Sequence, residues 1–252
     1  MNVLFVDSGI GGISTLATTI KHIPNLNFIY FADNKFSPYG SKSPSQITNR
    51  LLQIISQLAD ENIGLIVLAC NTATAAAVDN LRKLIKIPII GTEPAINLAP
   101  KTSPVLLLAT PVTTKHARIQ NLIEKHQGKV SVLPLPHFAK AIDKFYLFNS
   151  KKALFCIKKT IKTIKMAAKQ SSHIILGCTH YIFLAEIISK QTKKTVLDGN
   201  FGVYKQVLAH IKPEMISNCS IQKFILSKQK HDLCKKYRKI FDQTLANVSN
   251  VW

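Results

Sequence analysis

The chain lacks any hydrophobic run long enough to cross a membrane as a helix. No stretch of its 252 residues approaches the about 18 consecutive apolar residues that a spanning helix needs. The first residues, MNVLFVDSG, carry no basic leader, and their apolar run is too short for a signal peptide. With 46% hydrophobic residues the composition is that of a globular protein. We therefore expect a cytoplasmic, globular protein with no membrane partner.

Cysteine is scarce and shows no framework spacing. The five cysteines are an odd number, and no Cys-x-x-Cys pair is present. In a reducing compartment such cysteines are expected to be free thiols. Zinc-finger spacing is absent as well, and the chain contains neither a GxGxxG motif nor a P-loop lysine in its glycine-rich stretch 7–12.

Acidic residues are few. Thirteen acidic residues face 33 lysines and arginines, which gives a net charge of +20, and no acidic residue occurs from Lys144 to Ala185. Within that span, residues 151–170 have the pattern of an amphipathic helix with lysines on one face. This face is interpreted either as a solvated helix surface or as an electrostatic surface for nucleic acid or anionic small molecules. Because basic and aromatic residues do not interleave, we expect no nucleic-acid partner.

Predicted strands and helices alternate along the chain, which is typical of parallel sheets with crossover helices. The predicted strands are 3–6, 27–32, 63–69, 87–91, 105–110, 130–135, 173–177, 195–198 and 221–227. The predicted helices are about 12–22, 44–61, 73–84, 113–127, 151–170, 181–191 and 230–245.

The two halves of the chain resemble each other. VLFVDSGIGG has a counterpart in VLLLATPVTT, 102 residues later, and LIVLACNT has one in IILGCTH, 108 residues later. We interpret this as an internal repeat. The expected architecture is α/β, with two similar domains related by pseudo-two-fold symmetry, each a mostly parallel sheet flanked by helices. The first would comprise 1–96 and 207–252, the second 97–206, with an active site in the cleft between them.

Cys70 and Cys178 occupy matching positions in the two halves. Each follows an apolar strand and precedes polar residues at a predicted helix start, where the helix dipole favours a thiolate. A buried cysteine can also be simply a small hydrophobic residue, but two in the same context favour a functional role. Cys156, Cys219 and Cys234 lack polar companions, and we expect them to be structural.

Other candidate residues lie near these cysteines. Asp7 and Ser8 follow the first strand, in a glycine-rich turn where a backbone can approach an anion closely. Tyr39 and Gly40 end a turn-rich loop that could present a phenol and amides to a carboxylate. His180 is two residues from Cys178, which is too close for the usual zinc spacing but suits an imidazole that orients or deprotonates a thiol.

Two thiols in matching positions are compatible with several reactions. A redox disulfide lacks its usual motif, and a Cys–His hydrolase would leave one thiol without a role. Inversion at an acidic carbon needs a base on one face and an acid on the other, and two similar halves supply such a pair.

Six motifs together resemble the glutamate racemases of the cofactor-independent aspartate/glutamate racemase superfamily. They extend from the start of the chain to about Asp198. The Cys-Thr-His form resembles glutamate rather than aspartate racemases. The motifs are VDSGIGG (6–12), YFADNKFSPYG (30–40), LACNTATAA (68–76), GTEPAI (91–96), LLATPVTT (107–114) and LGCTHYIFL (176–184).

The resemblance implies interconversion of L- and D-glutamate without a cofactor or metal, and a supply of D-glutamate for peptidoglycan. It implies that Cys70 deprotonates D-glutamate with help from Asp7, and that Cys178 deprotonates L-glutamate with help from His180. The chain would be a monomer or a homodimer. Implied substrate contacts are Asp7, Ser8, Tyr39, Gly40, Asn71, Thr72, Thr113, Thr179 and His180.

The sequence departs from the family pattern at a few positions. Val112 and His116 stand where glycine and serine are frequent, and Gly199 alters a later Asp-Ser-Gly. Asp143 stands where a mid-chain glutamate is usual. Two other functions stay open: a racemase for a different acidic amino acid, and a basic protein that acts on DNA or on a nucleic-acid enzyme.

Overall fold

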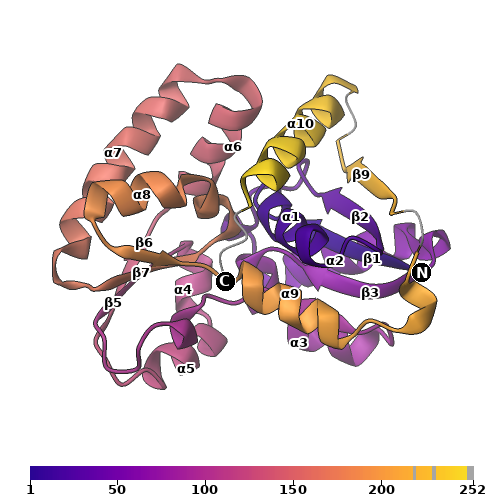
Figure 1. Ribbon diagram of the computed structural model, residues 1–252, viewed down its shortest axis with the longest axis horizontal. Helices are drawn as coiled ribbons and strands as arrows, with labels where there is room; N and C mark the ends of the chain where they lie inside the picture. Colours follow the sequence, from indigo (N-terminus) through magenta and orange to yellow (C-terminus); the bar gives the residue numbers. More distant parts are fainter. Residues whose placement is uncertain (218–219, 229–230, 249–252) are drawn as a thin grey trace. The chain divides into compact units, whose positions relative to one another are not determined.

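The structure, a computed structural model, describes residues 1–217, 220–228 and 231–248, and it divides into two compact units. The first unit joins Met1–Thr92 to Asn200–Trp252, and the second is Glu93–Gly199. Each unit contains one parallel sheet covered by helices (Figure 1). The expected α/β class, with two similar parallel sheets, is therefore confirmed.

The first unit is built on a five-stranded parallel sheet of order β4-β3-β1-β2-β9. One face is covered by α1, α9 and α10, and the other by α2 and α3 (Figure 1). The strands are β1 (Asn2–Asp7), β2 (Asn27–Ala32), β3 (Ile63–Leu68), β4 (Ile89–Gly91) and β9 (Gln222–Leu226). The helices are α1 (Ile13–His22), α2 (Pro44–Gln57), α3 (Asn71–Leu84), α9 (Asn200–Ala209) and α10 (His231–Asn247), with short 3-10 turns at Tyr39–Ser41, Ala59–Glu61 and Pro213–Met215.

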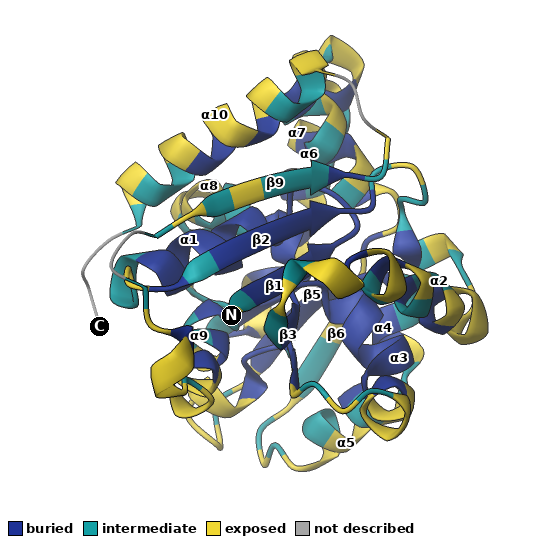
Figure 2. Cartoon of the chain, turned by 90° about the vertical axis from the view of Figure 1, so that its right-hand side faces the viewer, coloured by how far each residue is buried: buried dark blue, intermediate teal, exposed yellow. Residues whose placement is uncertain are grey.

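The burial of this sheet explains its sequence. The central strands β1 and β2 are covered on both faces and almost entirely buried, whereas β9 at the edge is only partly buried (Figure 2). A strand buried on both faces must be apolar at consecutive positions, as VLFV and FIYF are. Helix α2 begins with a capping box, in which Ser43 and Gln46 satisfy each other's backbone N–H groups.

The second unit is built on a four-stranded parallel sheet of order β6-β5-β7-β8. The strands are β5 (Val105–Ala109), β6 (Val130–Pro134), β7 (His173–Gly177) and β8 (Thr195–Leu197). The helices are α4 (Pro111–Lys115), α5 (Ala117–Glu124), α6 (Phe138–Phe148), α7 (Lys151–Ala167) and α8 (Ala185–Thr192), with 3-10 segments at Ile96–Leu98, Ala168–Gln170 and Thr179–Leu184.

The two sheets share one strand order. Numbered within each unit, the first four strands of both lie in the order second, first, third, fourth. The two cysteines follow the equivalent third strands, β3 and β7. This agreement supports the internal similarity seen in the sequence, and β9 is an addition at one edge of the first sheet.

Two predicted helices differ from the structure, and two observed helices were not predicted. The helix expected over 113–127 is interrupted at His116, which is extended and whose ring accepts from the Arg118 amide at 3.3 Å. The helix expected at 181–191 begins only at Ala185, after a 3-10 segment. Helix α6 begins after His137 in a left-handed conformation, without a side-chain cap, so it lacks a usual start signal. Helix α9 contains Gly202, and glycine disfavours a helix.

Among the described residues, no helix combines the length and the apolar character that a membrane span requires.

Candidate active site

In the first unit, three polar side chains lie at the carboxyl ends of neighbouring strands. The Asp33 amide donates to the Asp7 carbonyl at 2.8 Å, and the Ala69 amide donates to the Val6 carbonyl at 2.9 Å. The strand ends of β1, β2 and β3 are thus in register: Asp7 is the last residue of β1, and Asp33 and Cys70 lie just after β2 and β3. Asp7 is fully buried, and Cys70 is 6% exposed. A carboxylate and a thiol therefore lie at the carboxyl ends of adjacent strands, where ligands bind in parallel sheets.

The glycine-rich turn after β1 holds Asp7 in place. An oxygen of the Asp7 carboxylate accepts from the Gly9 amide at 2.7 Å, and the Tyr30 hydroxyl donates to the Gly9 carbonyl at 2.8 Å. At Gly12, an added Cβ would lie 2.8 Å from the Cβ of Ala69 and 2.9 Å from that of Asp7. Glycine is therefore required for the start of α1 to pack against the end of the strand that carries Cys70.

Cys70 is the N-cap residue of α3. Its carbonyl accepts from the Thr74 amide at 2.9 Å, so the 14-residue helix begins directly behind the thiol. The positive end of the helix dipole stabilises a negative charge at this position. Asn71 and Thr72 form the first turn and are buried, and the Asn71 side chain donates to the Thr92 carbonyl at 3.3 Å.

Tyr39 belongs to a buried polar network that the sequence did not predict. The Arg50 guanidinium donates twice to Asp33, at 2.6 and 2.8 Å, and the Tyr39 hydroxyl donates to Asp33 at 2.9 Å. Burial is the largest cause that raises the pKa of Tyr39 well above its usual value; the charges of Asp33, Cys70 and Asp7 add to it. The phenol is thus buried, neutral and within the electrostatic reach of Cys70. Gly40, the other residue expected to contact substrate in this loop, is half-buried and directly follows Tyr39.

The second unit places a carboxylate, an imidazole and a thiol in a row. The Sγ atom of Cys178 lies 4.0 Å from Nδ1 of His180, and Nε2 of the same ring lies 3.2 Å from Oδ1 of Asp143. A carboxylate only accepts, so the proton of the neutral imidazole belongs on Nε2. Nδ1 is then the basic nitrogen that faces the thiol.

Tyr181 is a further buried partner of Cys178. Burial, followed by the charge of Cys178 and a hydrogen bond with it, raises the pKa of Tyr181 well above its usual value. The Tyr181 hydroxyl also donates to the Leu135 carbonyl at 3.2 Å. The phenol therefore lies beside the thiol as a neutral group. The sequence analysis did not single out Tyr181. Its position directly after the Cys-Thr-His motif is the one signal that could have pointed to it.

The remaining expected contacts of the second unit are buried near the ends of its strands. Thr113 lies in α4, after β5, and its hydroxyl is 2.9 Å from that of Thr110, the N-cap residue of this helix. Thr179 follows Cys178 and is 1% exposed. The structure therefore brings the expected residues together in two groups. Asp7, Ser8, Tyr39, Gly40, Cys70, Asn71 and Thr72 belong to the first unit, and Thr113, Cys178, Thr179 and His180 to the second.

The other cysteines lie apart from these groups. Cys156 and Cys234 are half-buried free thiols in α7 and α10, and Cys219 lies outside the described residues. In the part of the chain that the structure describes, no cluster of three or more His, Cys, Asp or Glu side chains could hold a metal ion.

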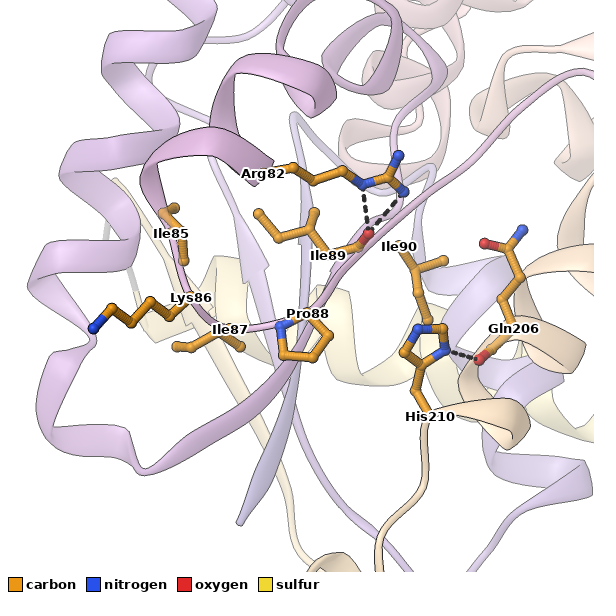
Figure 3. Close-up of a pocket in the computed structure, with 9 residues that line it drawn as sticks. All are labelled: Arg82, Ile85, Lys86, Ile87, Pro88, Ile89, Ile90, Gln206 and His210. Atoms are coloured by element: carbon orange, nitrogen blue, oxygen red, sulfur yellow. Dashed lines mark hydrogen bonds between the residues drawn. The ribbon is translucent and has the colours of Figure 1, made fainter.

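A cavity of about 350 Å³ lies in the first unit at the far end of α3 from Cys70 (Figure 3). Arg82 donates to the Ile89 carbonyl at 2.8 and 3.1 Å, and the His210 ring contacts the Gln206 carbonyl oxygen at 2.8 Å. None of the expected site residues lines this cavity. Its lining is Arg82, Ile85, Lys86, Ile87, Pro88, Ile89, Ile90, Gln206 and His210.

Comparison with known proteins places these groups in a family. The family model described as Asp/Glu/Hydantoin racemase matches residues 14–201. The chain belongs to the Asp/Glu/hydantoin racemase family. Glutamate racemase from Leptospira borgpetersenii serovar Hardjo-bovis is 38% identical over 227 residues, 87% of this chain and 86% of the relative. That of Clostridium novyi is 36% identical over 229 residues, which is 88% of this chain and 86% of the relative. The resemblance seen in the sequence and the predicted enzyme class, a racemase, are confirmed.

Solved structures share the fold of this racemase. Glutamate racemase from Escherichia coli, in complex with L-glutamate and the activator UDP-MurNAc-ala, superposes with a TM-score of 0.83 at 24% identity, covering 96% of this chain and 94% of that one. The Francisella tularensis glutamate racemase in complex with D-glutamate gives 0.78 at 24% identity, with 98% and 93% covered.

Proposed function

We propose that this racemase interconverts L- and D-glutamate by a two-base mechanism with Cys70 and Cys178 as the acid and base. The observation that carries the proposal is the equivalent placement of two buried thiols, each after the third strand of its sheet. Cys178 lies 4.0 Å from the His180 ring, and Cys70 follows the strand adjacent to the one that ends in Asp7. A Cys–His hydrolase needs only one such thiol, and a binding protein needs none. An inversion needs two, because the proton leaves one face of the α-carbon and arrives on the other.

On the side of Cys178, the partner is the pair His180 and Asp143. Nδ1 of the neutral imidazole accepts the thiol proton, and the resulting thiolate takes the α-proton of L-glutamate. Asp143 stabilises the imidazolium formed in this step through Nε2. In the reverse direction the Cys178 thiol gives its proton to the α-carbon, and the imidazolium then returns a proton to the thiolate. The same three groups therefore serve as an acid.

On the side of Cys70, the partner is Asp7. Both groups are buried, and they come from adjacent strands of the same sheet. The start of α3 favours the thiolate, which takes the α-proton of D-glutamate, while Asp7 holds the proton that the thiol gives up. In each direction one C–H bond breaks toward one sulfur and one forms from the other, so the overall reaction consumes no proton, electron or cofactor.

Glutamate carries two carboxylates and an ammonium group, and the expected contacts fit them. Amides at helix starts and buried hydroxyls bind carboxylates, and the Asp7 carboxylate suits the ammonium group. The names of the relatives and the two glutamate complexes support glutamate rather than another acidic amino acid. The proposed contacts are Asp7, Ser8, Tyr39, Gly40, Asn71, Thr72, Thr113, Thr179 and His180. We propose a cytoplasmic role in which D-glutamate is made for peptidoglycan.

The test is loss of circular dichroism from L-glutamate and, in parallel, from L-aspartate. We expect decay with L-glutamate and a rate with L-aspartate at least about 100-fold lower. Cys70→Ser and Cys178→Ser should each lower turnover by roughly 10³-fold or more, because a hydroxyl is a far weaker acid than a thiol. Cys156→Ser is the matched control and should leave turnover unchanged. Faster decay with L-aspartate would contradict the substrate, and full racemisation by either single variant would contradict the mechanism.

A further inference from the structure

Helix α7 presents two large apolar side chains to solvent. Phe155 is 72% exposed and Met166 is 69% exposed, the highest values among the large hydrophobic residues that the structure describes. They are eleven residues apart, which is close to three helical turns, so both project from the same line along the helix. Exposed apolar residues are common when scattered singly, but these two share one line on one helix.

Lysines surround this line on both sides. Lys162 lies between the two apolar side chains, Lys158 and Lys165 lie on one flank, and Lys152 and Lys159 lie on the other. All six lysines of α7 are exposed, and no acidic residue occurs from Lys144 to Ala185. Within the described residues, none of these six lysines forms an ion pair with a carboxylate.

The opposite face of α7 fixes this orientation. Ala153, Ile157, Ile161 and Ile164 are buried, and α7 packs against α6 and α8 on its inner side (Figure 1). The helix therefore cannot rotate to bury Phe155 and Met166 without exposing its core residues. The lysines and the two apolar side chains form a permanent surface of the second unit.

We infer that this α7 surface docks on a lipid bilayer that contains anionic headgroups. It consists of Lys151, Lys152, Phe155, Lys158, Lys159, Lys162, Lys165 and Met166. A helix lying on a bilayer places a few apolar side chains in the headgroup region and lysines around them against the lipid phosphates, and this is the arrangement on α7. Each lysine near an anionic surface contributes to attraction without a specific geometry. The helix is about 26 Å long, so the whole row can contact a flat surface at once.

The same features disfavour a nucleic acid as the partner. All cations of α7 are lysines, whereas phosphate recognition with fixed geometry favours arginine. The α7 surface has no side-chain amide or guanidinium group that could read base edges, and Met166 has no role on a phosphate backbone. The sequence predicted no membrane partner because no segment can span a bilayer. A peripheral surface needs no span.

Flotation of the full chain with lipid vesicles tests this inference. At low salt, we expect the protein to float with vesicles of phosphatidylcholine and phosphatidylglycerol, and to stay behind with phosphatidylcholine alone. Raising the salt should release it, because screening weakens the lysine attraction. A failure to float with either vesicle would overturn the inference, as would stronger retention on duplex DNA than on the anionic vesicles at equal salt.

Charge-matched variants separate the α7 surface from the general charge of +20. Lys158→Gln/Lys162→Gln/Lys165→Gln should weaken binding to the anionic vesicles roughly tenfold to a hundredfold. The exposed control Lys101→Gln/Lys129→Gln/Lys212→Gln removes the same charge elsewhere and should change binding less than about threefold. An equal loss in both triple variants would overturn the inference.

A second variant tests the apolar contribution alone. Phe155→Ser/Met166→Ser leaves the net charge unchanged and should still weaken vesicle binding by roughly tenfold, since two side chains no longer enter the headgroup region. Unchanged binding would overturn the docking geometry. All substituted positions are exposed, and none is a proposed catalytic or binding residue, so we expect every variant to keep its fold and its racemase activity. Far-ultraviolet circular dichroism and activity measurements check this.

Discussion

Nε2 of His180 lies 3.2 Å from the Asp143 carboxylate, so the imidazole is held between a carboxylate and the Cys178 thiol. We predict that Asp143→Asn lowers kcat for L-glutamate by roughly 10²-fold, because an amide can impose the tautomer with the proton on Nδ1. KM should change little, since Asp143 acts through His180. Asp143→Glu keeps a carboxylate and should recover most of the activity. An Asp143→Asn variant with the kcat and pH profile of the wild type would contradict this role.

Gly12 separates the ends of two strands, and its substitution should affect both stability and turnover. A Cβ at this position would lie 2.8 Å from the Cβ of Ala69 and 2.9 Å from that of Asp7. We predict that Gly12→Ala lowers the free energy of unfolding by roughly 1–3 kcal/mol and lowers kcat, because Asp7 and the Cys70 strand must shift. Urea unfolding and steady-state kinetics measure the two effects.

Gly202 provides the matched control, because an added Cβ there would contact nothing within 4 Å. Gly202→Ala should raise the free energy of unfolding by about 0.5 kcal/mol, since alanine favours the helix more than glycine does. An equal change in the free energy of unfolding for Gly12→Ala and Gly202→Ala would contradict the close packing described at Gly12.

The buried pair of Asp33 and Arg50 should matter more for stability than an exposed pair. The Asp33 side chain is fully buried, and that of Arg50 is 19% exposed. Arg50→Met removes the partner and leaves a buried carboxylate beside the Tyr39 hydroxyl, so we expect a loss of about 3 kcal/mol in the free energy of unfolding. Lys190→Met breaks an exposed pair with Glu186 and should leave the free energy of unfolding nearly unchanged, because solvent screens this pair. Equal losses in the two variants, measured by urea unfolding, would contradict the prediction.

Tyr39 and Tyr181 should make the protein sensitive to alkaline pH. Burial raises the pKa of both phenols above the usual value of 10.0, so the folded state keeps their protons longer than the unfolded state does. Their contribution to stability is complete below pH 10 and is lost as the pH rises further, by at most about 1.4 kcal/mol per pH unit for each phenol. In urea unfolding above pH 10, Tyr181→Phe should therefore lose less stability than the wild type, and equal losses in the two proteins would contradict the prediction.

The sequence predicted most strands and both thiols because most strands contain apolar runs and each thiol closely follows such a run. The side chains around the thiols were harder to predict. Asp143 is 37 residues from His180 in sequence and lies on α6, which has no start signal, so only the packing of α6 against the segment after Cys178 brings the two together. Tyr39 remains a proposed substrate contact, but the sequence did not predict that its hydroxyl donates to Asp33. Such pairings depend on the tertiary packing of distant segments.

Deuterium labelling tests the two-base mechanism most directly. L-Glutamate is incubated with the enzyme in heavy water, and the α-carbon of both isomers is analysed at early conversion. With two thiols, the proton removed by Cys178 stays on that side while Cys70 delivers deuterium, so we predict deuterium in the D-glutamate formed and almost none in the recovered L-glutamate. Equal deuterium in both isomers would show that one base serves both faces, and would contradict the roles proposed here for Cys70 and Cys178.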